Sequence, residues 1–378
     1  MSYIYDYLYV LYAGILSLPL IIQICIYFIL ASIALVILFF LTVAIMRYNY
    51  NRKVNREKKL FPKIDALIIK YLYSADPNIE AFEVKNEFIE KIGKLTKSKL
   101  DLVTERLIVC KNNYQVENNE NILRIMYVLE LDKHISDKLQ FSSTKQKIKG
   151  FKELATLAAS ANESDLLPFT YNRNRKIRLE ARTAYMKLSK NDPFKFFDET
   201  KDDLTVWDQI SLLTHLKTIE NFSIPNFSKW ITYSTNHSIV SFCLKMCSYF
   251  KQNESVASIV NFMNTPNHIL RAQAIQTLGD LHAVETEKTL QTLYTNQPQI
   301  CQLEILNALG KFKTGESIPF LKHEFSHASS LELRKFAAYA ILLHDDIGMG
   351  ILKEMENETN DSGKLILRHI ENPLIVYK

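Results

Sequence analysis

The chain has 378 residues, which is too long for one ordinary compact core and therefore indicates several domains or an array of repeats. It contains only 9 glycines and 10 prolines, a composition that favours long helices joined by short turns over a β-sandwich or a disordered scaffold. The formal net charge of +5 is small for this length, so we expect no nucleic-acid partner on this ground.

A long apolar segment opens the chain. Between Asp6 and Arg47 the only side chains that can ionise are tyrosines and one cysteine, and the most apolar part runs from Leu20 to Met46. At about 1.5 Å per residue this part gives roughly 40 Å of helix, enough to cross a hydrocarbon core of about 30 Å with some tilt. It lacks the basic start and the small-residue cleavage site of a signal peptide. We therefore predict a retained transmembrane anchor within residues 1–46.

Basic residues follow this segment directly. They are Arg47, Arg52, Lys53, Arg56, Lys58 and Lys59. Because the positive flank of a membrane helix stays in the cytoplasm, we expect a single pass through a bacterial cytoplasmic membrane, with the N-terminus outside and the rest inside. The tyrosines at positions 3, 5, 7, 9 and 12 suit the outer interface. For residues 47–60, a basic juxtamembrane linker, simple anchoring and attraction of anionic lipid at ~1 kcal/mol per cation both stay open.

Residues 61–144 carry helical patterns that follow no regular repeat. The patterns are Ile64–Tyr73, Phe88–Ile92, Leu100–Val109 and Ile122–Leu131, and a loop is predicted at Asn112–Asn121. Terminal units of a repeat array are atypical because they cover an open core. This stretch is therefore interpreted as an N-terminal cap or as divergent repeats.

From residue 145 onward the chain repeats itself about every 31 residues. Seven helical segments share one frame, and they start at Lys147, Arg178, Gln209, Val240, Arg271, Gln302 and Arg334. Three positions in this frame form apolar columns on one helical face. The first column is Gly150, Ala181, Leu212, Cys243, Ala274, Ile305 and Ala337. The second is Phe151, Arg182, Leu213, Leu244, Ile275, Leu306 and Ala338, and the third is Leu154, Tyr185, Leu216, Cys247, Leu278, Leu309 and Ile341. Arg182 is the one poor fit.

Shorter helices between these segments complete a helix–turn–helix unit. We expect Gly279 and Gly310 to end their helices in the left-handed conformation that favours glycine. A unit of this size buries its apolar face only against its neighbours, so the pattern predicts an all-α fold in which residues 145–378 form a stacked α-solenoid with a C-terminal cap. Cys110, Cys243, Cys247 and Cys301 fall at apolar positions and are expected to be buried thiols in a reducing compartment.

One repeat resembles a known family. The run from Leu270 and Arg271 through Ala274 to Leu278 and Gly279 is similar to the V-R-x-x-A-x-x-A-L-G signature of short HEAT repeats, the type also seen in phycobilisome lyases. The resemblance covers roughly residues 145–356 and implies a protein-binding superhelix without lyase activity. Gln209, Val240 and Gln302 replace the usual arginine, so we expect the bracing ion pairs of the family's turns to be missing there.

Two short motifs could hold a metal. His323, Glu324 and His327 form an H-E-x-x-H that would place two imidazoles one helical turn apart with Glu324 as base, as in a zinc metallopeptidase. A helix–turn–helix seam is no shielded cleft, and no third ligand is evident. His344, Asp345 and Asp346 are explained equally well by a polar turn. We therefore expect no catalytic residues, no metal and no cofactor.

The side of the repeat helices opposite the apolar columns is the expected partner site, here called the ladder surface. Its candidate residues are Phe242, Lys245, Gln273, Gln276, Asn307, Phe336 and Tyr339. Their chemistry is mixed and lacks the continuous basic stripe that phosphate backbones require. The aromatic members are expected to be covered by neighbouring helices, with a role as exposed anchors as the alternative.

These features together predict a membrane-tethered scaffold that presents a helical superhelix to a membrane-associated protein. The resemblance further suggests a membrane glycosyltransferase of exopolysaccharide synthesis as the partner. A zinc metallopeptidase and a module that binds a small ligand or nucleotide are the alternative functions.

Overall fold

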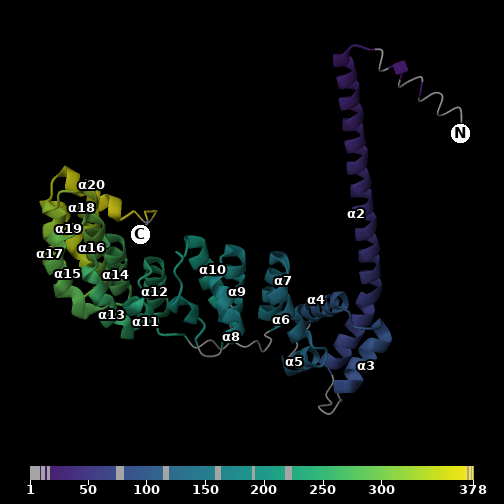
Figure 1. Ribbon diagram of the computed structural model, residues 1–378. Coiled ribbons are helices and arrows are strands. Elements are labelled where there is room, and N and C mark those ends of the chain that lie inside the picture. The colour runs from purple at the N-terminus through teal and green to yellow at the C-terminus, as the bar shows by residue number, and fades with distance from the viewer. Residues whose placement is uncertain are drawn as a thin grey trace. The chain divides into compact units, whose positions relative to one another are not determined.

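The computed structural model describes residues 9, 13–14, 18–73, 81–113, 119–157, 163–189, 192–217, 224–372, 374–375 and 377. Within these ranges the chain forms nineteen α-helices and no β-strand, which confirms the all-α prediction. The chain divides into two compact units, Met1–Ser136 and Asp137–Lys378 (Figure 1). The boundary lies inside a helix, whereas we expected it at residue 144.

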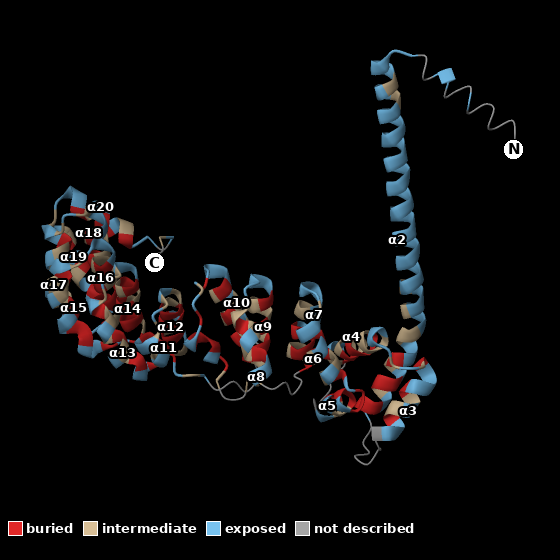
Figure 2. Cartoon of the chain, viewed as in Figure 1, coloured by how far each residue is buried: buried red, intermediate tan, exposed pale blue. Residues whose placement is uncertain are grey.

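Unit 1 is dominated by one helix of 53 residues, α2 (Leu20–Leu72). The helix is long and apolar enough to cross a membrane. Its apolar part is exposed along its length, and buried residues appear only toward its C-terminal end (Figure 2). Residues 47–60, which we predicted as a linker, are a helical continuation of this segment. The tyrosines at positions 3, 5, 7 and 12 lie outside the described residues.

The C-terminal end of α2 packs into the core of unit 1. Ile64, Leu67 and Ile68 are buried against α3 (Ala81–Ile92), α4 (Lys97–Asn113) and α5 (Asn119–Val128). Residues 114–118 of the predicted loop lie outside the described residues. The helix α6 (Leu131–Phe141) spans the boundary between the units.

Two polar contacts fix the end of α2. Arg106 on α4 donates two hydrogen bonds to Asp65, at 2.7 and 2.6 Å. Lys70, Tyr71 and Lys91 donate hydrogen bonds to Glu87 on α3. These bonds, the one from Lys70 foremost, hold the pKa of Glu87 at about 2, below its ordinary range.

Unit 2 contains seven helices that match the seven predicted segments, and we call them the repeat helices. They are α7 (Thr144–Leu157), α9 (Arg175–Leu188), α10 (Val206–Leu216), α12 (His237–Phe250), α14 (His268–Asp280), α16 (Gln299–Phe312) and α18 (Leu331–Leu342). Between them lie α8 (Glu163–Leu166), α11 (Ser228–Tyr233), α13 (Val256–Val260), α15 (Glu287–Leu293) and α17 (Ile318–His327). Short 3-10 helices occur at Leu167–Tyr171, Lys195–Asp198, Asn253–Ser255, Asn261–Asn264, Val284–Thr286 and Tyr294–Asn296. After α18 come α19 (Asp345–Glu358) and α20 (Asp361–Ile370).

The ends of the repeat helices recur at the predicted interval. Their N-caps from α9 to α18 are spaced 31 or 32 residues apart, at Asn174, Thr205, Asn236, Asn267, Pro298 and Ser330. Except for Pro298, each cap side chain accepts a hydrogen bond from a backbone N–H of the first turn. Left-handed residues follow α12, α14, α16 and α18 at the same interval, and they are Lys251, His282, Lys313 and Asp345. The backbone thus repeats with the period of the sequence.

Gly279 and Gly310 have a different role from the one we predicted. Both lie inside their helices, and the left-handed residues are His282 and Lys313 instead. A Cβ on Gly279 would lie 2.9 Å from the Ala308 Cα, closer than real Cβ atoms approach. The glycines therefore allow α14, α16 and α18 to pack closely, and they do not terminate helices.

The three apolar columns form the core of unit 2. Every member is buried except Leu213, which is half-buried. Where the first residue of the frame is arginine or glutamine, its side chain donates a hydrogen bond to a backbone carbonyl of the preceding turn, which the Val240 side chain cannot do. Arg271 donates to the Thr265 carbonyl at 2.6 and 2.9 Å, and Gln302 donates to the Tyr294 carbonyl at 3.1 Å. Glutamine therefore replaces the expected arginine as a donor to backbone at this position.

Candidate functional site

Phe242, an aromatic candidate of the ladder surface, is only 1 % exposed, so it is covered as expected and cannot serve as an exposed anchor. Its ring packs against Phe194, Phe197 and Phe227, with ring centroids 5.7 to 6.4 Å apart. The physical reason is that a repeat helix has neighbours on both sides as well as the shorter helices beneath it. Only a narrow strip of its surface stays open.

The polar residues of the ladder surface differ in how far they are exposed in this strip. Asn307 is buried, which corrects the prediction that it is exposed, whereas Gln276 is half-buried and Lys245 is exposed. Lys245 reaches Gln209 of the preceding repeat helix at 3.0 Å. Gln273 accepts from the Ser241 hydroxyl at 2.7 Å and donates to the Ser241 carbonyl at 2.8 Å. The ladder surface is thus narrower than predicted, and neighbouring helices bond to one another across it.

Ion pairs that we did not predict continue this pattern. Lys311 on α16 contacts Asp280 on α14 at 2.7 Å, and Lys313 contacts Asp345 at 2.7 Å. The two residues of each pair are 31 or 32 positions apart. Opposite charges spaced by one repeat could therefore have predicted these ion pairs from the sequence.

Phe336 and Tyr339 lie on α18 and are half-buried. Tyr377 covers them, because its ring stacks on Tyr339 at 4.4 Å and meets Phe336 edge-on at 5.5 Å. Phe336 and Tyr339 therefore form an aromatic surface that is already in contact with Tyr377 of the same chain.

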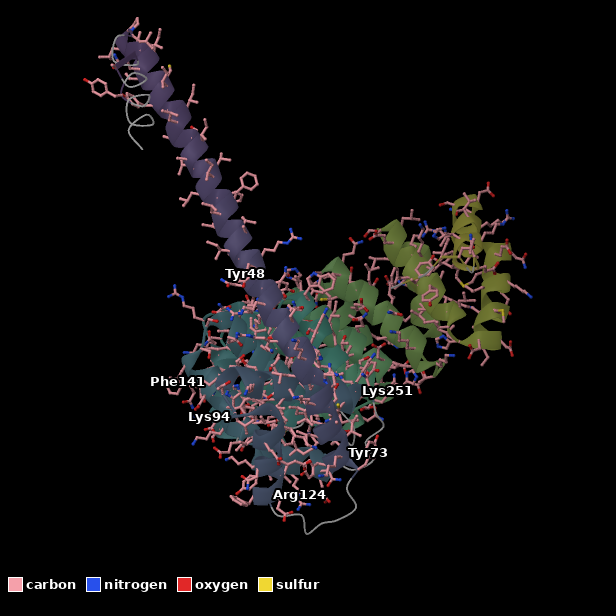
Figure 3. All side chains as sticks on the ribbon, turned by 90° about the vertical axis from the view of Figure 1, so that its right-hand side faces the viewer. Tyr48, Tyr73, Lys94, Arg124, Phe141 and Lys251 are labelled. Atoms are coloured by element: carbon pink, nitrogen blue, oxygen red, sulfur yellow. The ribbon has the colours of Figure 1, made fainter. Side chains whose placement is uncertain are left out.

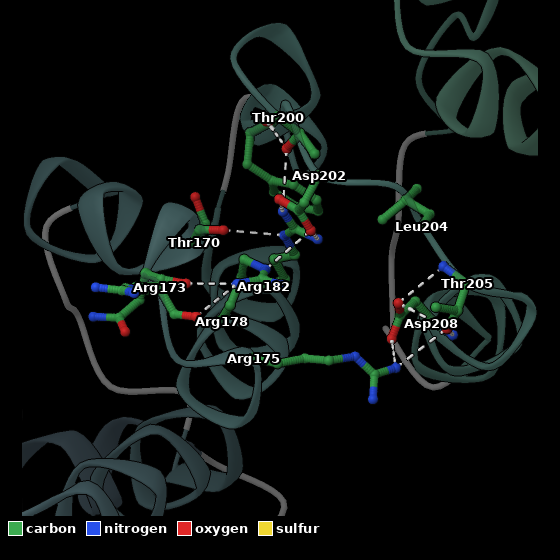
Figure 4. Close-up of polar contacts among 12 residues, drawn as sticks. Thr170, Arg173, Arg175, Arg178, Arg182, Thr200, Asp202, Leu204, Thr205 and Asp208 are labelled. Atoms are coloured by element: carbon green, nitrogen blue, oxygen red, sulfur yellow. Dashed lines mark hydrogen bonds and ion pairs between the residues drawn. The ribbon is translucent and has the colours of Figure 1, made fainter.

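Arg182, the poor fit among the columns, is compensated by a polar network (Figure 4). Its guanidinium is 1 % exposed and donates to the Thr170 carbonyl at 3.1 Å, to Thr200 at 3.3 Å and to Asp202 at 2.9 Å. It also lies over the Phe196 ring. Burial lowers the pKa of Arg182, and the hydrogen bond to Asp202 opposes that shift. This network joins the turns around α9 and is structural in character.

The basic cluster lies on the exposed part of α2. Tyr48, labelled in Figure 3, shares a shallow surface hollow with Asn51, Arg52, Asn55, Arg56 and Lys59. Of the six cluster cations, only Lys53 forms an ion pair among the described residues, with Glu57 at 3.6 Å. The remaining cations are exposed and can meet an external anion.

The H-E-x-x-H residues lie on α17. The His323 and His327 rings stack with centroids 4.5 Å apart. His323 Nδ1 lies 3.1 Å from the Glu324 carboxylate, and His327 Nδ1 donates to the His323 carbonyl at 3.0 Å. In the described part of the chain, no group of three or more His, Cys, Asp or Glu side chains gathers where it could hold a metal ion.

The residues of the second motif, His344 to Asp346, do not come together as a metal site, because His344 and Asp345 bond to different partners. His344 is buried and its Nδ1 donates to the Ala340 carbonyl at 3.0 Å, whereas Asp345 pairs with Lys313.

The four cysteines outside α2 are buried and unpaired with one another, as predicted. Burial raises the pKa of Cys247 to about 11 and that of Cys243 well above its usual value, which keeps both thiols protonated.

Comparisons with known proteins add little. No family model matches the chain, and no curated protein is similar to it. Among solved structures, the chain is similar to an engineered protein from the Northeast Structural Genomics Consortium at 13% identity, with 83% of this chain and 89% of that chain covered and a TM-score of 0.29. A likeness at this level carries no argument about fold or function.

Proposed function

We propose that this protein is a membrane-tethered scaffold. In this proposal α2 crosses the cytoplasmic membrane once, with its N-terminal end outside, and unit 2 is a HEAT-type α-solenoid that binds a protein partner in the cytoplasm. The observation that carries the proposal is the common interval of N-caps, left-handed residues and buried columns in unit 2. Stacked units of this kind expose extended surfaces that bind proteins.

The unbroken course of α2 supports the tether. The helix leaves its apolar part at Met46 and remains helical until Leu72, where it is buried in unit 1. The residues between Met46 and the buried Ile64 correspond to roughly 25 Å of helix at about 1.5 Å per residue. A tether of this length keeps unit 1 close to the bilayer and raises its local concentration around membrane partners. The exposed cations on this stretch favour the cytoplasmic side and attract anionic headgroups.

Topology can be tested with reporters. A reporter active only in the cytoplasm should be active when fused after Lys378 and inactive when fused after Ser2. The reverse result would overturn the proposed orientation and the cytoplasmic location of unit 2.

Partner binding can be tested by photocrosslinking in native membranes. A photoreactive residue at Lys245, on the ladder surface, should give a discrete crosslinked product. The same photoreactive residue at Lys288, which is also exposed but lies on α15, is the matched control and should give no such product. Equal products from both positions would show that the ladder surface is not the binding site. A membrane glycosyltransferase is the partner class to examine first in the crosslinked product.

A further inference from the structure

An exposed apolar row follows the N-terminal ends of the repeat helices in unit 2. Its members are Phe141, Trp207, Tyr233, Ile269, Ile300 and Leu331, and their exposed fractions run from 43 % for Ile300 to 83 % for Phe141. Each lies in the first two positions of a repeat helix or ends the helix that precedes one. Single exposed apolar residues are common, but here they gather near the N-terminal ends of several repeat helices, and Trp207, Ile269 and Ile300 share one position, the second residue of the helix.

The packing of the helices makes part of this row continuous. Ile269 and Ile300 are the second residues of α14 and α16, and Leu331 is the first residue of α18; these three helices pack against one another in succession. Neighbouring helix axes are about 8–10 Å apart, so the three side chains form a strip of roughly 20 Å. They lie beside the N-caps, and the same register places Trp207 next to the cap of α10.

The end of this edge formed by α7 and α9 is basic and favours an anionic surface. Lys145, Arg173 and Lys176 are exposed at the starts of α7 and α9. The apolar row has no member on α9. The helix N-termini add partial positive charge to the same edge. Two exposed acids, Asp203 and Glu332, also lie there. Exposed Trp, Tyr and Phe together with aliphatic side chains and cations are the combination that the bilayer interface favours.

We propose that this edge of unit 2 rests on the surface of the lipid bilayer, with Trp207, Ile269, Ile300 and Leu331 inserted among the headgroups. The inference rests on the proposed membrane anchor, because α2 would keep unit 2 near the bilayer. It adds a second membrane contact that would orient the ladder surface relative to the membrane and its embedded partners.

Trp207 allows a direct test, because the chain has only two tryptophans and the other, Trp230, is 3 % exposed in the aromatic core. The full chain is reconstituted into phosphatidylcholine–phosphatidylglycerol vesicles, with and without phosphatidylcholine brominated near the headgroup end of its chains. Flotation first establishes that the protein is bound to vesicles. We expect brominated lipid to remove most of the Trp207 emission. The matched variant Trp207→Phe should show little quenching, because only Trp230 then emits.

A second variant tests the strip itself. Replacing Ile269, Ile300 and Leu331 together by Ser should restore Trp207 emission in brominated vesicles, while the protein still floats through α2. If wild-type protein floats but brominated lipid leaves Trp207 unquenched, the edge does not touch the bilayer and the anchor stands. Iodide present on both sides would then quench Trp207, as expected for an edge that is free or serves a protein partner. If the protein does not float, both the anchor and the edge contact are overturned.

Discussion

Gly310 and Ala340 meet backbone to backbone. A Cβ on Gly310 would lie 2.7 Å from the Ala340 Cα, and Gly279 faces Ala308 in the same way one interval earlier. The three helices α14, α16 and α18 therefore approach through glycine and alanine pairs. Their spacing depends on the absence of one atom at each crossing.

The first prediction concerns this approach. Gly310→Ala should destabilise unit 2 by roughly 1–3 kcal/mol, because the added methyl must push α16 away from backbone atoms that cannot move aside. Gly350→Ala is the matched control, since it lies in helix α19 with no atom within 4 Å of the added Cβ. The control should stabilise by about 0.5–1 kcal/mol through helix propensity. Thermal unfolding of both variants distinguishes the two effects, and equal stabilisation would contradict the close contact.

The second prediction concerns the columns. Leu278→Ala and Leu309→Ala should each cost about 2–5 kcal/mol, because both side chains are fully buried. Gln276→Ala should change stability by less than about 0.5 kcal/mol, because its side chain lies in the half-open strip. Hydrogen exchange should show the losses first in the helices that neighbour the substituted one. An equally large loss for Gln276→Ala would refute the register.

The third prediction concerns the buried arginine. Arg182→Ala should cost about 2–3 kcal/mol, because it leaves the buried Thr170 carbonyl without this donor and removes packing on Phe196. Asp202 keeps Arg178 as a partner at 3.0 Å, which limits the loss. Arg175→Ala on the same helix removes an exposed guanidinium while buried Asp208 keeps its hydrogen bonds from Thr205, so it should cost less than about 1 kcal/mol. Denaturant titration of the two variants measures the difference, and similar losses would show that Arg182 adds no more than a surface pair.

The fourth prediction concerns acid stability in unit 1. The folded pKa of Glu87 is about 2, below its ordinary value, so this carboxylate stabilises the fold above the unfolded pKa. That contribution is lost as the pH falls from about 4.5 toward 2. Hydrogen exchange in α3 should therefore accelerate over this range in the wild type, and much less in Glu87→Gln. Glu90→Gln, on the exposed side of the same helix, should behave like the wild type. A parallel acid response in Glu87→Gln would exclude this carboxylate as the cause.

The fifth prediction concerns the H-E-x-x-H motif. Purified protein should carry no near-stoichiometric zinc by elemental analysis. His323→Ala and His327→Ala should leave metal content and thermal stability unchanged, because His323 is exposed and His327 bonds only within its own turn. Stoichiometric zinc that both variants lose would instead make a metallopeptidase the leading function.

Local sequence determined the helices, their period and the burial of the columns. Apolar side chains are buried wherever the fold allows. Residues that recur at a strict interval, such as Leu278 and Leu309, can therefore be predicted as buried without a structure. The long apolar part of α2 can be recognised from the sequence for the same reason. The N-caps were not among the predictions, although Asn, Thr and Ser recur at one position of the frame.

Tertiary packing decided which of the other faces stay open. Phe242 and Asn307 occupy ladder positions in the sequence, yet both are buried, Phe242 against the rings of Phe194, Phe197 and Phe227. Tyr377 covers Phe336 and Tyr339 from a distant part of the chain, and Gly310 serves a helix crossing that no local rule describes. Exposure depends on atoms that lie far away in sequence. Helical periodicity therefore determined which residues turn inward, and only the stacking of the helices decided which outward residues still meet water.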